Sequence, residues 1–285
     1  MIRVGLRLIY DWPQNCGVPE GDTVWRSCRR LHEVLAGHRL SRGEFCVPAL
    51  ATTELTGIRV LEVRSRGKHQ LFRFDNQMTL HTHLRMEGTW RIFRAGRRWS
   101  GGPDYEIRSI LATAEHDAVG YRLPVIELIP TTNEPDVVGH LGPDLLGPDW
   151  DPEEAVRRIS AEHDRTIGEA LLDQRNLAGI GTLYRAEVLF LQGLHPRTPV
   201  AEVKYLARLV QRSHQLLYAN RWRPEQATTG DLRPGRRTYV FGREREPCRR
   251  CGTPIEAETF GPPGQERRSL WCPRCQPLIG RTVRS

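Results

Sequence analysis

Two pairs of cysteines near the C-terminus constrain the fold of this chain more than any other feature. Cys248 and Cys251 are separated by two residues, as are Cys272 and Cys275, and 20 residues lie between the pairs. This spacing lets both sulfurs of a knuckle face one ion, and two knuckles close a tetrahedral site with no open position for water. We therefore predict one structural Zn²⁺ per chain. Four unrelated thiols are the alternative, which the double spacing disfavours.

The charge of the chain points to a polyanionic partner. Lys and Arg total 42 against 34 acidic residues, a formal net charge of +8. The segment 221–250 is the most basic stretch and adjoins the cysteine pairs, and Arg267 and Arg268 lie between them. Guanidinium groups on a rigid hairpin suit phosphate contact, although a solvated basic face is the alternative. No apolar run approaches the roughly 20 residues that a membrane span needs.

The order of hydrophobic patterns predicts an α+β chain. Helical spacing over residues 23–35 is followed, from about 37 to 130, by short alternating runs separated by turn residues. These runs predict an N-terminal antiparallel β-sandwich with a flanking helix. Helical periodicity returns after Asp151, which is followed by Pro152 as at a capped helix start. The predicted units are a β-sandwich domain at 19–133, a linker at 134–150, a helical domain at 151–238 and a zinc-finger β-hairpin module at 239–285.

A glycine-containing turn lies between two of the predicted helices. Gly179 and Gly181 let the backbone approach a partner closely, and the helix that starts at Thr182 begins with N–H groups that lack helical partners. Such an end is a ready phosphate site. A tight turn between packed helices would also use glycine here, and this feature alone favours that interpretation.

Five motifs occur in a fixed order and together carry a resemblance. They are Pro19-Glu20-Gly21-Asp22-Thr23, Arg66-Gly67-Lys68, His83-Leu84-Arg85-Met86-Glu87-Gly88, the segment 171–181 and the cysteine pairs. The chain resembles the formamidopyrimidine-DNA glycosylase / endonuclease VIII family, on its endonuclease VIII-like side, from Pro19 to about Gln276. The turn at Gly179 is similar to the family's helix–two-turn–helix.

The resemblance implies a DNA-repair enzyme, a glycosylase with lyase activity. It implies that Pro19 is the nucleophile, Glu20 the general acid/base, and Lys68 the group that holds the phosphate beside the lesion. It also implies that Met86 wedges into the base stack, supported by Arg85. Further DNA contacts are implied at Gly181, Thr182 and Arg267, with Arg268 as the rival of Arg267. We expect damaged DNA as partner, no cofactor for the chemistry, a monomer, and a cytoplasmic location at the nucleoid.

The position of Pro19 departs from the family, whose chemistry needs proline as the first residue. An N-terminal amine titrates near 8 and is partly unprotonated at neutral pH. An internal proline nitrogen is instead a tertiary amide without a basic lone pair. We predict that Val18 is the true start, read as an initiator methionine that is then removed, and that residues 1–18 are a non-native extension. If translation begins at Met1, the alternative is a catalytically silent damaged-DNA-binding protein.

Two further departures concern DNA contact and substrate. Thr182 stands where relatives commonly carry Asn, and a hydroxyl offers one donor where an amide offers two, so this contact is expected to be weaker. The segment 221–244 lacks the Gly-Gly-Ser/Thr loop associated with oxidised purines, and the Pro-Glu-Gly start leans towards endonuclease VIII. We therefore expect oxidised pyrimidines and abasic sites to be preferred over 8-oxoguanine.

Overall fold

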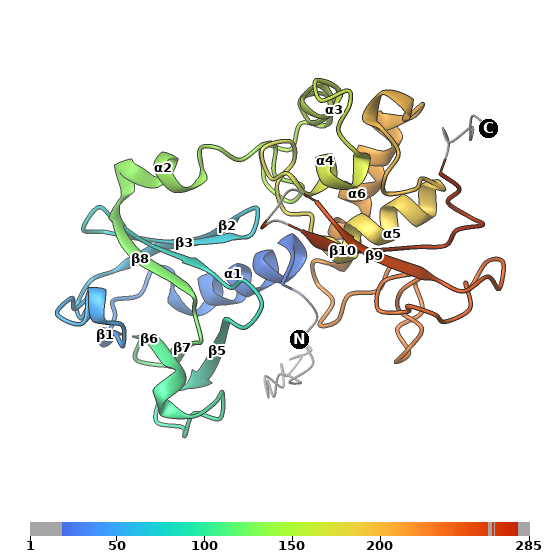
Figure 1. The fold of residues 1–285 in the computed structure, drawn as a ribbon. Coiled ribbons are helices and arrows are strands. Elements are labelled where there is room, and N and C mark those ends of the chain that lie inside the picture. Colours follow the sequence, from blue (N-terminus) through green and yellow to red (C-terminus); the bar gives the residue numbers. More distant parts are fainter. Residues whose placement is uncertain (1–18, 262–263, 265, 279–285) are drawn as a thin grey trace, which may run out of the picture.

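The structure is a computed structural model that describes residues 19–261, 264 and 266–278. The predicted non-native extension 1–18 lies outside the described residues. Figure 1 shows a sheet-rich half, coloured blue to green, beside a helical half that ends in a small hairpin. The α+β class predicted from the sequence is confirmed. No helix of the described ranges is long and apolar enough to cross a membrane.

Two four-stranded antiparallel sheets form the β-sandwich. One sheet has the order β1-β6-β7-β5 and the other β2-β3-β4-β8. The first comprises β1 (Arg42–Phe45), β5 (Thr89–Arg94), β6 (Ile107–Ala112) and β7 (His116–Tyr121). The second comprises β2 (Val60–Arg66), β3 (His69–Phe74), β4 (Met78–His83) and β8 (Val125–Pro130). Short 3-10 turns lie at Pro48–Leu50, Asp104–Glu106, Thr131–Asn133 and, in the helical half, Val200–Glu202.

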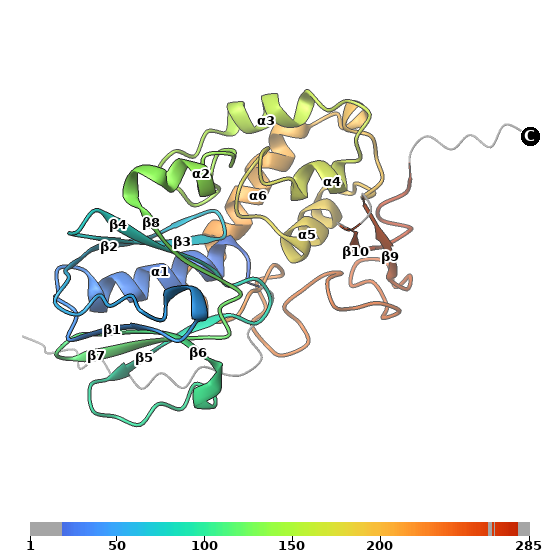
Figure 2. The ribbon, with the colours of Figure 1, turned by 60° about the vertical axis from the view of Figure 1, so that its left-hand side comes forward.

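Helix α1 (Gly21–Leu35) packs one face into this half and leaves the other, with Arg29 and Glu33, exposed. Its buried face, which includes Val24 and Leu31, joins one hydrophobic core with Phe72 and Leu80 of one sheet and Leu111 of the other. Figure 2 shows α1 running between the planes of the two sheets. The burial of this apolar stripe explains the helical spacing seen in the sequence.

The second half is built from four helices, reached through a connection that itself contains a short helix. The elements are α2 (Glu134–Val138) in the connection, then α3 (Pro152–Ser160), α4 (Ile167–Leu172), α5 (Thr182–Gln192) and α6 (Leu206–Asn220). Asp151 caps α3 as predicted, because its carboxylate accepts the N–H groups of Glu153 and Glu154, each at 3.0 Å. The helices share a core of their own.

The C-terminal hairpin consists of β9 (Glu256–Phe260) and β10 (Arg267–Trp271), paired antiparallel. Its apolar residues Ile255 and Leu270 pack with Ala186 and Phe190 of α5 and with Cys272. The hairpin is therefore attached to the helix that starts at the glycine turn, and its two cysteine pairs lie at its base.

Candidate active site

The segment that begins at Pro19 lies against the glycine turn of the helical half. The Gly21 N–H donates to the Gly179 carbonyl oxygen at 2.8 Å, which joins the start of α1 to the turn before α5. A Cβ on Gly21 would lie 2.9 Å from the Gly179 Cα, closer than real Cβ atoms approach. Glycine is required here because two backbones touch. Pro19, half-buried, is thereby placed at the boundary between the two halves.

Glu20 caps α5 from the other half of the molecule. Its fully buried carboxylate accepts the N–H of Gly181 at 2.6 Å and that of Leu183 at 2.7 Å. A Cβ on Gly181 would lie 2.6 Å from the Glu20 Cδ, so glycine makes room for the carboxylate. In this structure the Gly181 N–H is therefore bonded within the chain, and the DNA contact expected at Gly181 stays a prediction. Gly181 thus admits a carboxylate of the same chain, which lies at the positive, N-terminal end of the helix dipole.

The environment of Glu20 brings its carboxyl into the neutral range. Burial raises the pKa of Glu20 to about 7, and the nearby charge of Asp22 adds to this effect. The charge of Lys68 and the N–H groups of α5 oppose the rise in pKa without cancelling it. A carboxyl that titrates near neutral pH can both deliver and accept a proton under physiological conditions.

Lys68 reaches the same region from the turn between β2 and β3. Gly67 occupies the left-handed region at φ 58°, and its N–H donates to the buried Asp144 carboxylate at 2.7 Å. A Cβ on Gly67 would lie 3.0 Å from the Ala178 Cβ, so this turn also packs against the helical half. Burial lowers the pKa of the Lys68 amine; the Glu20 carboxylate acts in the opposite direction, and Arg267 lowers the pKa further.

The two candidate arginines of the hairpin have different surroundings. Arg267 lies within electrostatic reach of Lys68 and of the buried Arg185 on α5. Arg268 instead forms an ion pair with Glu244, and its carbonyl oxygen accepts the Arg185 guanidinium at 2.8 Å. Both side chains are exposed. Of the two, Arg267 is the one whose charge the structure couples to Lys68.

Asp22 is a buried acid at this boundary, and no motif of the sequence predicts a role for it. The Tyr184 hydroxyl donates to its carboxylate at 2.9 Å, and the Gln226 side-chain amide donates to the other oxygen at the same distance. Asp22 thus ties the first turn of α1 to α5 and to the segment after α6. An acid is common in the first turn of a helix because its charge interacts favourably with the helix dipole. Its long-range partners have no signal in the sequence.

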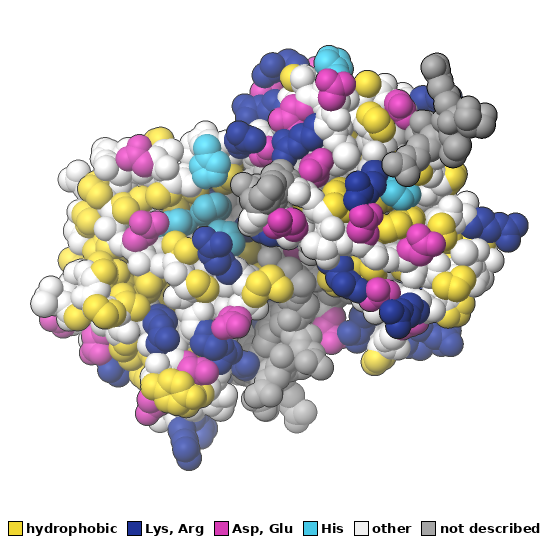
Figure 3. Space-filling model, viewed as in Figure 1, with side chains coloured by type: hydrophobic (Ala, Val, Ile, Leu, Met, Phe, Trp, Pro, Cys, Tyr) yellow, Lys and Arg dark blue, Asp and Glu magenta, His cyan; other side chains and the backbone are white. Residues whose placement is uncertain are grey.

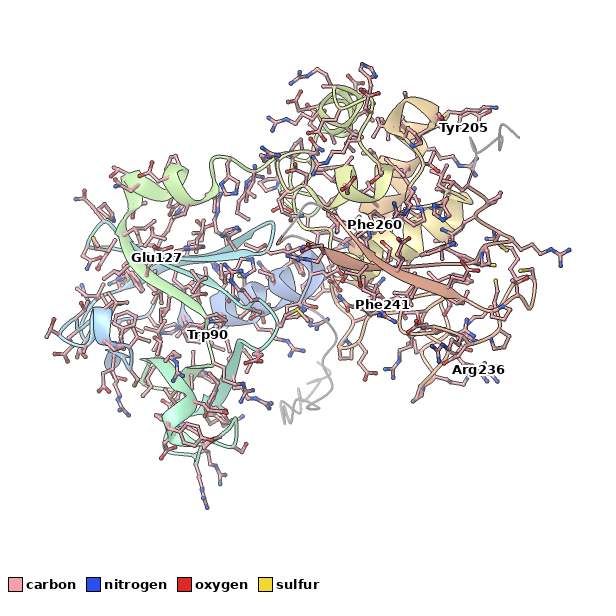
Figure 4. All side chains as sticks on the ribbon, in the orientation of Figure 1. Trp90, Glu127, Tyr205, Arg236, Phe241 and Phe260 are labelled. Carbon is pink, nitrogen blue, oxygen red and sulfur yellow. The ribbon has the colours of Figure 1, made fainter. Side chains whose placement is uncertain are left out.

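Met86 projects from the turn after β4. It is 68 % exposed, the fraction expected of a side chain available to a partner. The turn is tight: the Gly88 N–H donates to the Leu84 carbonyl oxygen at 2.8 Å, and Arg85 adopts a left-handed φ of 46°. Met86 and Pro19 line one cleft of about 720 Å³ together with Trp90. Figure 4 places Trp90 on the sandwich side of the molecule.

The four cysteines of the hairpin module converge as their spacing predicts. The sulfurs of Cys248, Cys251, Cys272 and Cys275 all lie within 4.8 Å of one another, and none of the four forms a disulfide. Cys251 and Cys272 approach to 3.4 Å between sulfurs. Four thiolates in a closed cluster are the donor set of a tetrahedral structural metal site. The module can therefore hold a metal ion at the base of β9 and β10.

Comparison with known proteins is consistent with this architecture. Residues 18–123 match the formamidopyrimidine-DNA glycosylase N-terminal domain, and residues 141–222 match the formamidopyrimidine-DNA glycosylase H2TH domain. The Lactococcus lactis formamidopyrimidine-DNA glycosylase, solved with DNA containing an AP site, superposes with a TM-score of 0.74 at 23% identity. That match covers 90% of this chain and 99% of the Lactococcus chain, and it shows the shared fold.

Curated relatives match at higher identity over nearly the same span. A Streptomyces coelicolor protein named "Probable endonuclease 8 2" is 54% identical over 261 residues, which cover 91% of this chain and 94% of the relative. "DNA-(apurinic or apyrimidinic site) lyase Nei2" of Mycolicibacterium smegmatis is 44% identical, over 91% of this chain and 99% of the relative. With both domains matched and relatives this similar along almost their whole length, the chain belongs to the formamidopyrimidine-DNA glycosylase family.

Proposed function

We propose that this protein is a bifunctional DNA glycosylase and AP lyase of base excision repair. The observation that carries the proposal is the junction at Glu20, where a carboxyl with a pKa of about 7 lies directly beside Pro19 and within electrostatic reach of Lys68. Family membership and relatives named endonuclease 8 and AP lyase support it. Such an enzyme acts on the chromosome, so we place it in the cytoplasm at the nucleoid, as a monomer.

The proposed reaction starts at the nitrogen of Pro19, exposed as the first residue of the working chain. This secondary amine attacks C1′ of the damaged nucleotide, and the base leaves with the electron pair of the glycosidic bond and a proton. Opening of the sugar ring gives a positively charged iminium between Pro19 and C1′. That charge acidifies the C2′ proton, whose loss expels the 3′ phosphate, and a second elimination expels the 5′ phosphate.

The surrounding residues are assigned roles in this reaction. Glu20 exchanges the proton with the opening ring oxygen, for which a pKa near neutral is suited. Lys68 and Arg267 hold the phosphates beside the lesion, and Arg268 is the weaker candidate because it pairs with Glu244. Met86, supported by Arg85, fills the space that the flipped nucleotide leaves. The hydroxyl of Thr182 remains a proposed phosphate contact of the glycine turn.

The metal of the hairpin module is proposed to be Zn²⁺. Cys248, Cys251, Cys272 and Cys275 would hold it, and its contribution is the rigid placement of Arg267 on β10. A closed four-thiolate site leaves no position for a substrate or water, so the ion takes no part in the chemistry. Among substrates we propose oxidised pyrimidines and abasic sites over 8-oxoguanine, in line with relatives named endonuclease 8.

The test is borohydride trapping on duplex DNA with one abasic site. Two proteins are compared, one started at position 18 with its initiator methionine removed and one started at Met1. Borohydride reduces the iminium to a stable cross-link, so the shorter protein is expected to be trapped and the longer one not. Should neither protein be trapped while both bind, the chain is a damaged-DNA-binding protein without catalysis.

A further inference from the structure

Two strands of one sheet, β3 and β4, place three imidazoles in a row beside Lys68. His69 begins β3 and pairs with His83 on β4, while His81, two residues earlier on β4, pairs with Glu127 on β8. Side chains two residues apart share a face of a strand. His140, from the connection after α2, lies 6.3 Å from the His69 ring centroid. His69, His81, His83 and His140 are called the histidine row below. Cyan histidine side chains gather beside basic ones on the face shown in Figure 3.

Hydrogen bonds run along the row from its acidic end. The Glu127 carboxylate lies 2.7 Å from Nδ1 of the buried His81, and Nε2 of His81 lies 2.8 Å from Nδ1 of His69. Glu127 projects from β8 on the outer side of the sandwich (Figure 4). The rings of His69 and His81 stack at 5.0 Å, and His83 meets His69 edge-on at 4.9 Å.

This connectivity decides where the protons lie when the row is neutral. A carboxylate only accepts, so His81 carries its proton on Nδ1 and leaves Nε2 as an acceptor. His69 must then donate from Nδ1, which leaves its Nε2 without a proton. The row thus has a site for one further proton at His69. Once that proton is bound, the Glu127 carboxylate lies at the far end of the chain, where it stabilises the positive charge through His81.

In the protein without DNA, the surroundings of the row disfavour binding of this further proton. Burial is the main cause that lowers the pKa of His69 to about 3 and that of His83 to about 4. The positive charges of Lys68 and Arg85 act in the same direction. Among the charged groups that face the row, Glu127 is an acid, and Lys68 and Arg85 are cations. The arrangement is short of negative charge.

We propose that the histidine row is a phosphate-binding site that takes up a proton when a DNA phosphodiester binds against it. The proposal rests on the proposed function, because Lys68, Arg85 and Met86 border the row and are assigned there to DNA. A phosphate supplies the negative charge that the row lacks, and it accepts a hydrogen bond from the protonated His69. The row is then cationic only when DNA is bound, and binding is coupled to proton uptake.

The experiment measures the affinity of the full chain for duplex DNA with a tetrahydrofuran abasic analogue, which cannot be cleaved. Fluorescence anisotropy is recorded at fixed ionic strength, because phosphate contacts make affinity depend on salt. For the parent protein we expect Kd to fall by about fivefold or more between about pH 7.5 and about pH 5. Uptake of one proton on binding can change Kd by at most about tenfold per pH unit. His69→Gln should reduce this change to less than about twofold.

Two further variants make the outcome decisive. Glu127→Gln changes a partly exposed side chain, so the fold is retained, and loss of its charge should weaken the pH dependence. His163→Gln, at an exposed position between α3 and α4, is the matched control and should keep the parent's pH dependence. If His69→Gln and Glu127→Gln both bind DNA with the pH dependence of the parent, the proposal is overturned, while the proposed function stands. Failure of the parent to bind abasic DNA at any pH refutes the proposed function instead.

Discussion

The buried carboxyl of Glu20 allows a direct test of the electrostatics of the site through the change Glu20→Gln. An ordinary Glu titrates near 4.5, and in the folded protein burial raises the pKa of Glu20 to about 7. Because the folded pKa lies above the unfolded one, the stabilisation linked to the protonated carboxyl is fully present below the unfolded pKa. It is lost as the pH rises towards the folded pKa.

The magnitude follows from the two pKa values. A rise from 4.5 to about 7 corresponds to about 3 kcal/mol in the free energy of unfolding, since one pKa unit is about 1.4 kcal/mol. About 2 kcal/mol of this change falls between about pH 5 and about pH 8. A glutamine has no such titration, so its stability relative to the parent should rise by that amount across the same range. The amide also places a donor against a helix N–H, but this cost is independent of pH.

Urea denaturation at a series of pH values measures the difference. The free energy of unfolding is determined for the parent, for Glu20→Gln and for Glu153→Gln, which changes an exposed carboxyl on α3 and serves as the matched control. A difference between Glu20→Gln and the parent that is flat, or that shifts in favour of the parent as pH rises, would contradict a raised pKa of Glu20. The same variant tests the chemistry separately, because its lyase activity should fall even where its stability gains.

The remaining predictions concern the backbone contact and the metal. Gly21→Ala adds a Cβ 2.9 Å from the Gly179 Cα. The two halves must then shift apart, and urea denaturation should show a loss of about 1–3 kcal/mol in the free energy of unfolding. Removal of the metal by a chelator should make the segment from Glu256 to Trp271 sensitive to protease and should weaken DNA binding by about tenfold or more. The β-sandwich should stay folded because its core is separate, and an unchanged proteolytic pattern after chelation would contradict a structural metal.

The elements of the fold were predictable where a local sequence pattern is compatible with only one structure. The cysteine spacing predicted the converging sulfurs, and the acid before Pro152 predicted the start of α3. The apolar stripe of α1 predicted a helix. Such a stripe shows that one face of the helix is buried, but not whether one sheet or two sheets cover it. The position of α1 between two sheets therefore had to come from the structure.

The sequence offered candidates for the site, but not the contacts between them. Glu20 and Lys68 were found through motif order, whereas the capping of α5 by Glu20 was not, since no local pattern links positions 161 residues apart. Gly181 makes room for this carboxylate, a contact between distant positions that the local sequence does not reveal. The hydrogen-bonded chain of His69, His81 and Glu127 depends on strand register, which brings the three residues together only after the sheet has formed.

The capping of α5 by Glu20 has a consequence for the newly made chain. Glu20 is synthesised early, and the N–H groups that hold its carboxylate belong to residues made much later. Until Leu183 has left the ribosome and the halves have docked, Glu20 is a solvated acid with no reason to titrate near neutral pH. We therefore expect nascent and truncated chains to lack the proposed strand-cutting activity until the two halves have docked.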